Sequence, residues 1–242
     1  MFNNFKFILR LIRISSILAK YDCLFLLDHL GVGSIPRILA KTLLPKPLKS
    51  IKGLRVGERL SKALQELGPS FIKFGQTWST RPDLIGNNVA DDLAELRDRL
   101  PPFSIKNVHD IISESFGKEI KELFLDFDEK PIAAASIAQV HFALTKNNEE
   151  VAVKVLRPGI EKAFKQDIEL FKWIANIVNK TQQYAERLKP IEIIKKFEET
   201  SLLEMDLSIE AAAASELQEN FKECDFYYVP KINWSLTSRR VL

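Results

Sequence analysis

Lys154 is the residue whose setting most clearly suggests chemistry, because it ends the run Val151-Ala152-Val153-Lys154. The alternation is typical of a strand with Val151, Val153 and Val155 on the core face and Ala152 with Lys154 on the other. A strand lysine is most often an edge residue whose stem lies on apolar surface while its amine reaches water. Its alternative role is to bind phosphate, and the segment upstream favours that role.

A run of small side chains precedes this lysine, and its Ser136 lies 18 residues before Lys154. Small side chains let backbone N–H groups approach phosphates, which a strand lysine can also reach. A strand, a small-residue loop, a second strand and a third strand with V-A-x-K follow one another as in the nucleotide lobe of a protein kinase. Alanine replaces the usual glycine in this run, which is Ile132, Ala133, Ala134, Ala135, Ser136, Ile137, Ala138, Gln139 and Val140.

A second candidate is Lys73-Phe74-Gly75-Gln76, where Lys73 and Gln76 share one face of a helix expected to begin at Ser70. Gly75 would allow another backbone to approach closely. Taken alone, the segment is an ordinary helix with one packing glycine. It gains significance only together with the alanine-rich run and the acidic residues below.

Three glutamates in a helix expected at residues 190–222 are candidates to pair with Lys154: Glu198, Glu204 and Glu210. Glu204 also forms an E-x-D pair with Asp206, and two positions on an unbroken helix differ by about 200°. Both carboxylates can therefore face one site only where the helix is distorted, and the partner of Lys154 stays open. The lone His141 is interpreted as structural.

Together these motifs resemble the UbiB family of atypical protein-kinase-like ATPases, a group associated with ubiquinone biosynthesis. The resemblance covers residues 57–240. It rests on K-x-G-Q at 73–76, A-A-A-S-I-A-Q-V-H at 133–141, V-A-V-K at 151–154 and E-x-D at 204–206.

The resemblance implies that residues 132–140 cover the phosphates of ATP and that Lys154 pairs with them. Lys73 and Gln76 would belong to an extension that folds over the active site and favours ATPase over protein-kinase behaviour. Glu204 and Asp206 match the acidic motif of the family, placed near the lysine or the covering helix. Implied partners are a nucleotide and, on a membrane surface, ubiquinone-biosynthesis enzymes or lipid at the cytoplasmic face of the inner membrane.

Phosphoryl transfer also needs a carboxylate on a catalytic loop and another that holds Mg²⁺. No stretch like H-R-D or D-F-G follows Lys154, so we assign no catalytic residue and no metal ligand to this chain. The C-terminal lobe of the family, which would supply the Mg²⁺ site, and its membrane-spanning tail are expected to be missing. We therefore expect no measurable phosphoryl transfer by these 242 residues alone.

Charge is distributed unevenly along the chain. Residues 1–56 hold ten lysines and arginines against two aspartates, a balance of +8, so the remaining 186 residues sum to −5. The first thirty residues resemble a basic amphipathic helix, which either lies on an anionic membrane or packs on the protein. Nucleic acid is not expected as a partner, because the basic segment lacks aromatic and arginine interleaving of the stacking kind and the body of the chain is acidic. Cys23 and Cys224 are expected to be free core thiols.

The predicted fold class is α+β, with a kinase-like N-lobe of a small antiparallel sheet and a long helix after a helical extension. Predicted domains are 1–54 (basic helix, and linker from 34), 55–122 (helical, with K-x-G-Q) and 123–242 (N-lobe). Helices are expected at 56–67, from Ser70, at 88–100 with Asn88 as N-cap, from Ser104 to near Gly117, at 160–182 and at 190–222. Strands are expected at 124–127, 139–144, 151–156 and 228–232, with a further strand opening at 239–242.

Two other functions are compatible with the sequence. The chain could be a non-catalytic module that binds a partner enzyme or a lipid surface through its N-terminal helix. It could also be half of a split enzyme whose other lobe is a separate chain, or a truncated remnant without function.

Overall fold

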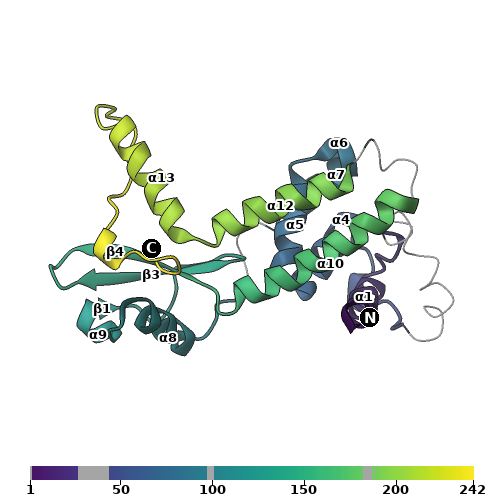
Figure 1. The fold of residues 1–242 in the computed structure, drawn as a ribbon, viewed down its shortest axis with the longest axis horizontal. Coiled ribbons are helices and arrows are strands. Elements are labelled where there is room, and N and C mark those ends of the chain that lie inside the picture. The colour runs from purple at the N-terminus through teal and green to yellow at the C-terminus, as the bar shows by residue number, and fades with distance from the viewer. Residues whose placement is uncertain (1, 27–43, 97–100, 182–186, 188) are drawn as a thin grey trace. The chain divides into compact units, whose positions relative to one another are not determined.

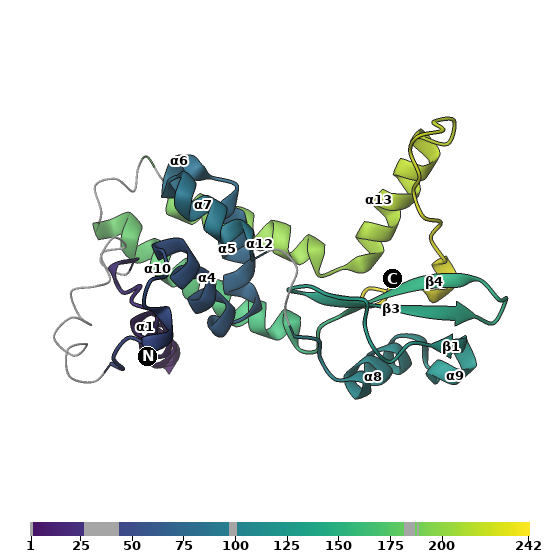
Figure 2. The same cartoon turned by 180° about the vertical axis from the view of Figure 1, so that it is seen from behind.

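The computed structural model describes residues 2–26, 44–96, 101–181, 187 and 189–242 (Figures 1 and 2). The chain forms two compact units: a first unit of Met1–Arg97 with Ala163–Glu198, and a second unit of Asp98–Lys162 with Glu199–Leu242. Each unit is therefore assembled from separate stretches of sequence. The three domains expected from the sequence are continuous stretches, and their functional division stays a prediction.

The first unit is helical. It contains α1 (Phe2–Lys20), η1 (Lys49–Ile51), α4 (Val56–Leu67), α5 (Pro69–Ser79), α6 (Pro82–Ile85), α7 (Asn87–Ala94) and the larger parts of α10 (Ile160–Thr181) and α12 (Pro190–Glu204).

The helix predicted at 56–67 is confirmed, and the one expected from Ser70 begins one residue earlier, at Pro69. The helix predicted at 88–100 has different bounds in the structure. It begins one residue earlier, at Asn87, and ends already at Ala94. Its N-cap is Gly86 with φ of 81°, a backbone conformation that suits glycine, and not Asn88. Positions 34–43 of the predicted linker and 97–100 of the predicted helix lie outside the described residues.

Phenylalanine rings from α5, α10 and α12 form the core of the first unit. Phe71 meets Phe171 edge to face at 5.1 Å between ring centroids, and Phe74 meets Phe197 in the same way at 5.3 Å. Phe164 stacks on Phe197 at 6.5 Å. Such contacts add to the burial of apolar area, so this cluster fixes α5 against α10 and α12.

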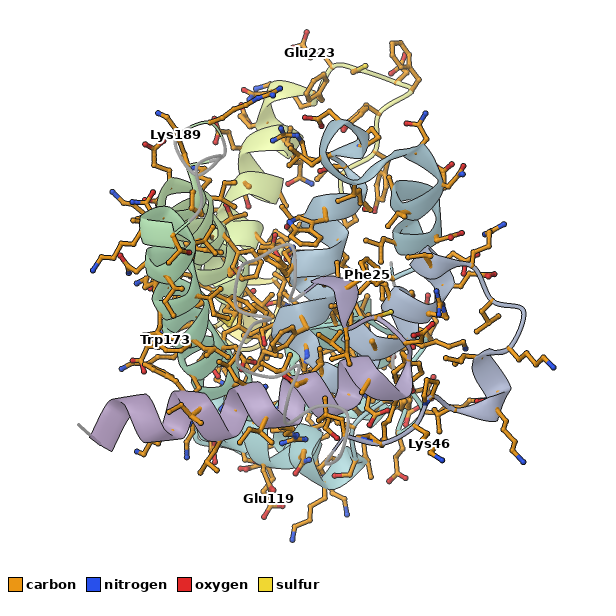
Figure 3. All side chains as sticks on the ribbon, turned by 90° about the vertical axis from the view of Figure 1, so that its right-hand side faces the viewer. Phe25, Lys46, Glu119, Trp173, Lys189 and Glu223 are labelled. Carbon is orange, nitrogen blue, oxygen red and sulfur yellow. The ribbon has the colours of Figure 1, made fainter. Side chains whose placement is uncertain are left out.

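The N-terminal helix α1 packs on the first unit through its later half, where Ile14, Ile17 and Leu18 are buried. Near the start of α1, the ring centroid of Phe7 lies 5.8 Å from that of Trp173 on α10. Figure 3 shows Trp173 on α10, beside α1. The packed-helix alternative is thus correct for the later half. Cys23, just after α1, is fully buried, and burial raises the pKa of its thiol to about 11.

The second unit holds a small antiparallel sheet with helices on both faces (Figure 1). β3 is central: β4 pairs with one edge, while β1 and β2 pair with opposite ends of the other. The elements are α8 (Ile105–Phe116), α9 (Ile120–Leu123), β1 (Phe124–Phe127), β2 (Ala133–Ala134), β3 (Ala138–Thr145), β4 (Glu150–Leu156), α13 (Leu207–Asn220) and η2 (Trp234–Leu236). This confirms the predicted α+β class, and the predicted hairpin turn joins β3 to β4.

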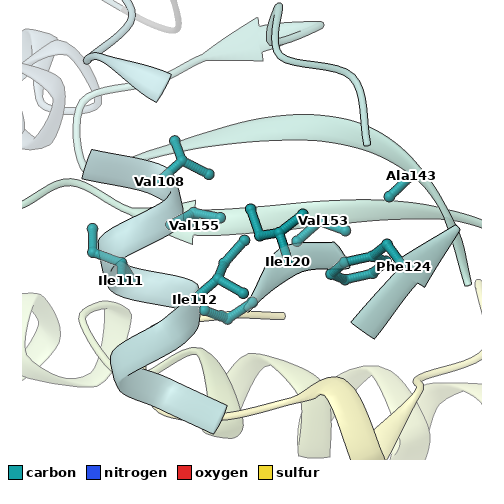
Figure 4. Close-up of a cluster of buried hydrophobic side chains, with 9 residues drawn as sticks. Val108, Ile111, Ile112, Ile120, Phe124, Ala143, Val153 and Val155 are labelled. Carbon is teal, nitrogen blue, oxygen red and sulfur yellow. The ribbon is translucent and has the colours of Figure 1, made fainter. Parts of the chain in front are cut away.

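The core of the second unit lies between α8 and the sheet. Val108, Ile111 and Ile112 of α8 and Val153 and Val155 of β4 belong to one buried cluster, and Figure 4 shows Val108 and Ile112 beside the strand. The N-cap of α8 is Ser104, whose hydroxyl accepts from the amide of Asn107, as the sequence predicted. The predicted alternation of β4 is therefore confirmed, and Lys154 lies on the face away from this core.

Three expectations for the C-terminal region need correction. The helix predicted at 190–222 is two helices, α12 and α13, with a break between Glu204 and Leu207. No strand forms at 228–232, a described stretch in which Tyr228 is largely exposed. Cys224 is free but only half-buried, so it is not a core thiol. Of the strand opening expected at 239–242, only Val241 pairs, as an isolated bridge to Val155 of β4, since residues 239 and 240 form a bend.

Candidate functional site

The alanine-rich run is a β-hairpin and not the open loop that the sequence suggested. Ala133 pairs with Val140, and the turn closes where the amide of Ala135 donates to the carbonyl of Ala138 at 2.8 Å. Within the described residues, no acceptor is found for the amides of Ser136 and Ile137 at the tip. A tip with small side chains and two available amides is suited to an anionic ligand.

Lys154 lies directly opposite Val140 of the hairpin in the β3–β4 register. Its backbone is held on the other edge as well, since its amide donates to the carbonyl of Leu242 at 2.6 Å and its carbonyl accepts from Leu242 at 2.9 Å. The strand β3 on one side and Leu242 on the other therefore fix the position of this lysine relative to the hairpin.

Glu210 is the carboxylate that pairs with Lys154. The ammonium donates to both carboxylate oxygens at 2.7 Å, and the two side chains are 28% and 50% exposed. Glu198, another candidate from the sequence, belongs to the first unit and pairs with Lys172 at 2.5 Å. Of the three glutamates left open, the structure thus selects Glu210, and it leaves the lysine accessible to solvent.

The helix break at the E-x-D pair explains how Glu210 reaches Lys154. Glu204 is the last residue of α12, and Asp206 is the N-cap of α13, where its carboxylate accepts from the amide of Ser208 at 3.1 Å. The amide of Leu207 donates to the carbonyl of Arg239 at 2.9 Å. The helix is therefore distorted between Glu204 and Asp206, which is the condition for both carboxylates to face one site. Glu210 lies one turn into the new helix, α13.

Lys73 and Gln76 lie on α5 in the first unit, whereas the hairpin and Lys154 belong to the second unit. The side-chain amide of Gln76 donates to the carbonyl of Leu96 at 3.0 Å. A Cβ on Gly75 would lie 2.6 Å from methyl groups of Leu64 and Leu96. The glycine is thus needed for packing against leucine side chains, whereas the sequence suggested a second backbone.

Gln139 and His141 form a buried polar pair at the base of the hairpin. His141 is 0% exposed; its Nε2 accepts from the Gln139 amide at 2.9 Å, which leaves Nδ1–H to donate to the carbonyl of Asp128 at 2.7 Å. Burial lowers the pKa of His141, which keeps the ring neutral. The structural role predicted for His141 fits this geometry. Sequence reasoning missed the link between His141 and Gln139, although alternate positions on a strand share one face.

Among the described residues, no helix is both long and apolar enough to cross a membrane. Nor do three or more histidine, cysteine or acidic side chains gather there in a way that could hold a metal ion.

The chain is similar to known kinase-like proteins. Residues 95–242 match the family of the ABC1 atypical kinase-like domain. Relatives named probable protein kinase UbiB include one from Marinobacter nauticus, 45% identical over 77% of this chain and 34% of the relative. Another, from Cellvibrio japonicus, is 41% identical over 97% of this chain and 42% of the relative. The chain spans less than half the length of these curated relatives.

A solved structure has a similar fold. The complex of Rv3197 with erythromycin from Mycobacterium tuberculosis has a TM-score of 0.50 and 20% identity, covering 88% of this chain and 49% of that one. The family match spans more than half of the chain, and the resemblance to UbiB is confirmed. The chain therefore belongs to the family of ABC1 atypical kinase-like proteins, with UbiB among its relatives.

Proposed function

We propose that the second unit binds the phosphates of ATP, with the hairpin at 132–140 covering them and Lys154 pairing with them. The observation that carries the proposal is the Lys154–Glu210 pair, in which a carboxylate holds the ammonium opposite the hairpin. An ammonium is a compact cation suited to phosphate oxygens, and a partly exposed carboxylate can orient it without removing it from solvent. Membership of an atypical kinase-like family supports the same ligand.

The residues at the hairpin fit a polyphosphate. The amides of Ser136 and Ile137 have no acceptor among the described residues, and backbone amides are the donors that phosphate-binding loops use. Bound ATP would supply a transferable γ-phosphoryl group. We propose that transfer of this group, and Mg²⁺ coordination, require carboxylates of a C-terminal kinase lobe, so that residues 1–242 alone bind nucleotide without hydrolysing it.

Replacing Lys154 with alanine is expected to weaken ATP binding by the 242-residue chain at least tenfold, because a charge-assisted contact to phosphate is lost. Titration calorimetry with ATP measures the change. Lys118→Ala is the matched control, since Lys118 is an exposed lysine in the turn after α8 of the same unit. Equal affinity of the Lys154 variant and the wild type, or no saturable binding by either, would contradict the proposal.

By family resemblance, Lys73 and Gln76 are proposed to cover the nucleotide site, and the E-x-D residues to act close to it. The position of Asp206 as the cap of α13 supports an indirect role, because it places the helix that carries Glu210. Support of ubiquinone biosynthesis is the proposed cellular role, by analogy with the UbiB relatives.

A second candidate function is binding to an anionic membrane surface through α1. Ile8, Leu9 and Ile12 are 48%, 52% and 55% exposed, although they belong to an amphipathic helix. Lys6 and Arg13 are exposed on the same helix. Apolar side chains flanked by cations are typical of helices that lie in a membrane interface. This arrangement would place the protein on a membrane surface, and the resemblance to UbiB makes the cytoplasmic face the proposed one.

Sedimentation with phosphatidylglycerol vesicles tests this second function. We expect the chain to bind them more than phosphatidylcholine vesicles, and the triple substitution Ile8→Ser, Leu9→Ser, Ile12→Ser to reduce binding at least tenfold. Leu202→Ser with Leu203→Ser is the control, because both leucines are more than half exposed on α12. The second function would be contradicted if the chain bound both kinds of vesicle equally, or if the triple variant bound phosphatidylglycerol vesicles as well as the wild type does.

A further inference from the structure

Arg157, the residue that follows β4, contacts the tip of the alanine-rich hairpin twice. Its backbone amide donates to the carbonyl of Ile137 at 2.7 Å, and its guanidinium Nη2 donates to the carbonyl of Ala135 at 3.1 Å. Both carbonyls belong to the connection between β2 and β3. Because Arg157 lies three residues after Lys154, these contacts tie the hairpin tip to the strand that carries the lysine.

The same guanidinium holds the segment that enters α8. Nη2 also donates to the carbonyl of Pro101 at 3.2 Å, and the guanidinium lies over the ring of Phe103 at 5.3 Å from its centroid. No carboxylate lies within salt-bridge distance of Arg157 in the part of the chain that the structure describes. Burial lowers the pKa of Arg157, so carbonyl dipoles and an aromatic face are what compensate its charge.

The side chain of Gln139 makes two hydrogen bonds to the backbone of Phe103, the residue whose ring the guanidinium covers. Its side-chain oxygen accepts from the amide of Phe103 at 2.9 Å, and its side-chain nitrogen donates to the carbonyl of Phe103 at 3.4 Å. Gln139 is 1% exposed, so these bonds are shielded from water. Phe103 is thereby fixed to the base of the hairpin by Gln139, while the guanidinium resting on Phe103 reaches the hairpin tip at Ala135.

We propose that Arg157 is a positioning residue that fixes the tip of the alanine-rich hairpin relative to Lys154. Its guanidinium connects the tip to the Pro101–Phe103 segment, which Gln139 in turn anchors. The consequence of this role for nucleotide binding rests on the proposed function, whereas its effect on the hairpin does not. A held tip would present the amides of Ser136 and Ile137 without a further loss of backbone entropy when a ligand binds.

Amide hydrogen exchange of the 242-residue chain without nucleotide tests the positioning role. In Arg157→Leu, we expect exchange of the amide of Ala135 to rise at least tenfold, while exchange in β3 and β4 stays unchanged. In Arg157→Lys, the exchange rate of the Ala135 amide should lie between those of the wild type and Arg157→Leu, because an ammonium can reach one carbonyl but does not stack on Phe103. Arg240→Leu is the matched control, a half-buried arginine elsewhere in the same unit. Unchanged exchange at Ala135, or an equal rise across the sheet, would overturn the proposal.

The ATP affinity of the same variants separates the two proposals. Arg157→Leu should weaken ATP binding about tenfold, and Lys154→Ala should weaken it while leaving exchange at Ala135 as in the wild type. If Lys154→Ala has no effect on affinity, the proposed function fails and the exchange result still decides the role of Arg157. If Arg157→Leu loosens the hairpin without changing affinity, its role in presenting the hairpin to nucleotide is overturned.

Discussion

Replacing Asp167 with alanine is expected to lower the free energy of unfolding of the first unit by about 3 kcal/mol. Asp167 is 4% exposed on α10, and its Oδ1 accepts from Arg10 Nε at 3.0 Å and Nη2 at 2.7 Å. Its Oδ2 accepts from the hydroxyl of Ser70, which is fully buried. The substitution leaves that hydroxyl without its acceptor and removes the ion pair between Arg10 of α1 and α10.

Urea unfolding followed by tryptophan fluorescence in a Trp234→Phe background measures this loss, since the remaining indoles, Trp78 and Trp173, both lie in the first unit. Asp167→Asn should lower the free energy of unfolding less than Asp167→Ala, because the amide oxygen of the asparagine can still accept from the hydroxyl of Ser70. Asp91→Ala is the control, an exposed aspartate on α7 that should change stability by less than about 0.5 kcal/mol. A loss below about 1 kcal/mol for Asp167→Ala would show that this carboxylate does not hold the helices together.

The elements that the sequence predicted well are those whose pattern is local. The helix at 56–67 follows the apolar period, and the strand pair around Lys154 alternates with a polar turn between its strands. The break after Glu204 interrupts an apparently continuous helical pattern, so periodicity missed it. Asp206 followed by Ser208 is a capping signal that could have revealed it. Pro230 likewise argued against the strand at 228–232, because proline cannot donate to a ladder.

The site was only partly predictable, for a geometric reason. The motifs point to Lys154 and the alanine-rich run, but a choice among three glutamates requires the phase of a helix, which the break at Asp206 resets. The Arg157 contacts join residues 22 and 56 positions apart, and no local pattern specifies such pairs. Tertiary packing determines which residues form these contacts, and it also brings the methyl groups of Leu64 and Leu96 close to Gly75.

Replacing Phe164 with alanine is expected to lower the free energy of unfolding of the first unit by about 3 to 5 kcal/mol. Phe164 is 1% exposed and stacks on Phe197, which also contacts Phe74 and Phe171. Truncation removes the ring and leaves a cavity beneath Phe197, where α10 and α12 meet. Urea unfolding followed by tryptophan fluorescence measures the loss.

Benzene provides a second measurement, because apolar cavities of this kind stay dry and bind it. Benzene should raise the unfolding midpoint of Phe164→Ala but not that of the wild type, since the buried ring of Phe164 fills this space in the wild type. Phe226→Ala is the matched control, a phenylalanine that is 93% exposed and should be neutral. If Phe164→Ala costs no more than Phe226→Ala, the aromatic cluster is not what holds α5, α10 and α12 together. A large loss without benzene rescue would mean that the helices close over the cavity and shift the α5 residues Lys73 and Gln76.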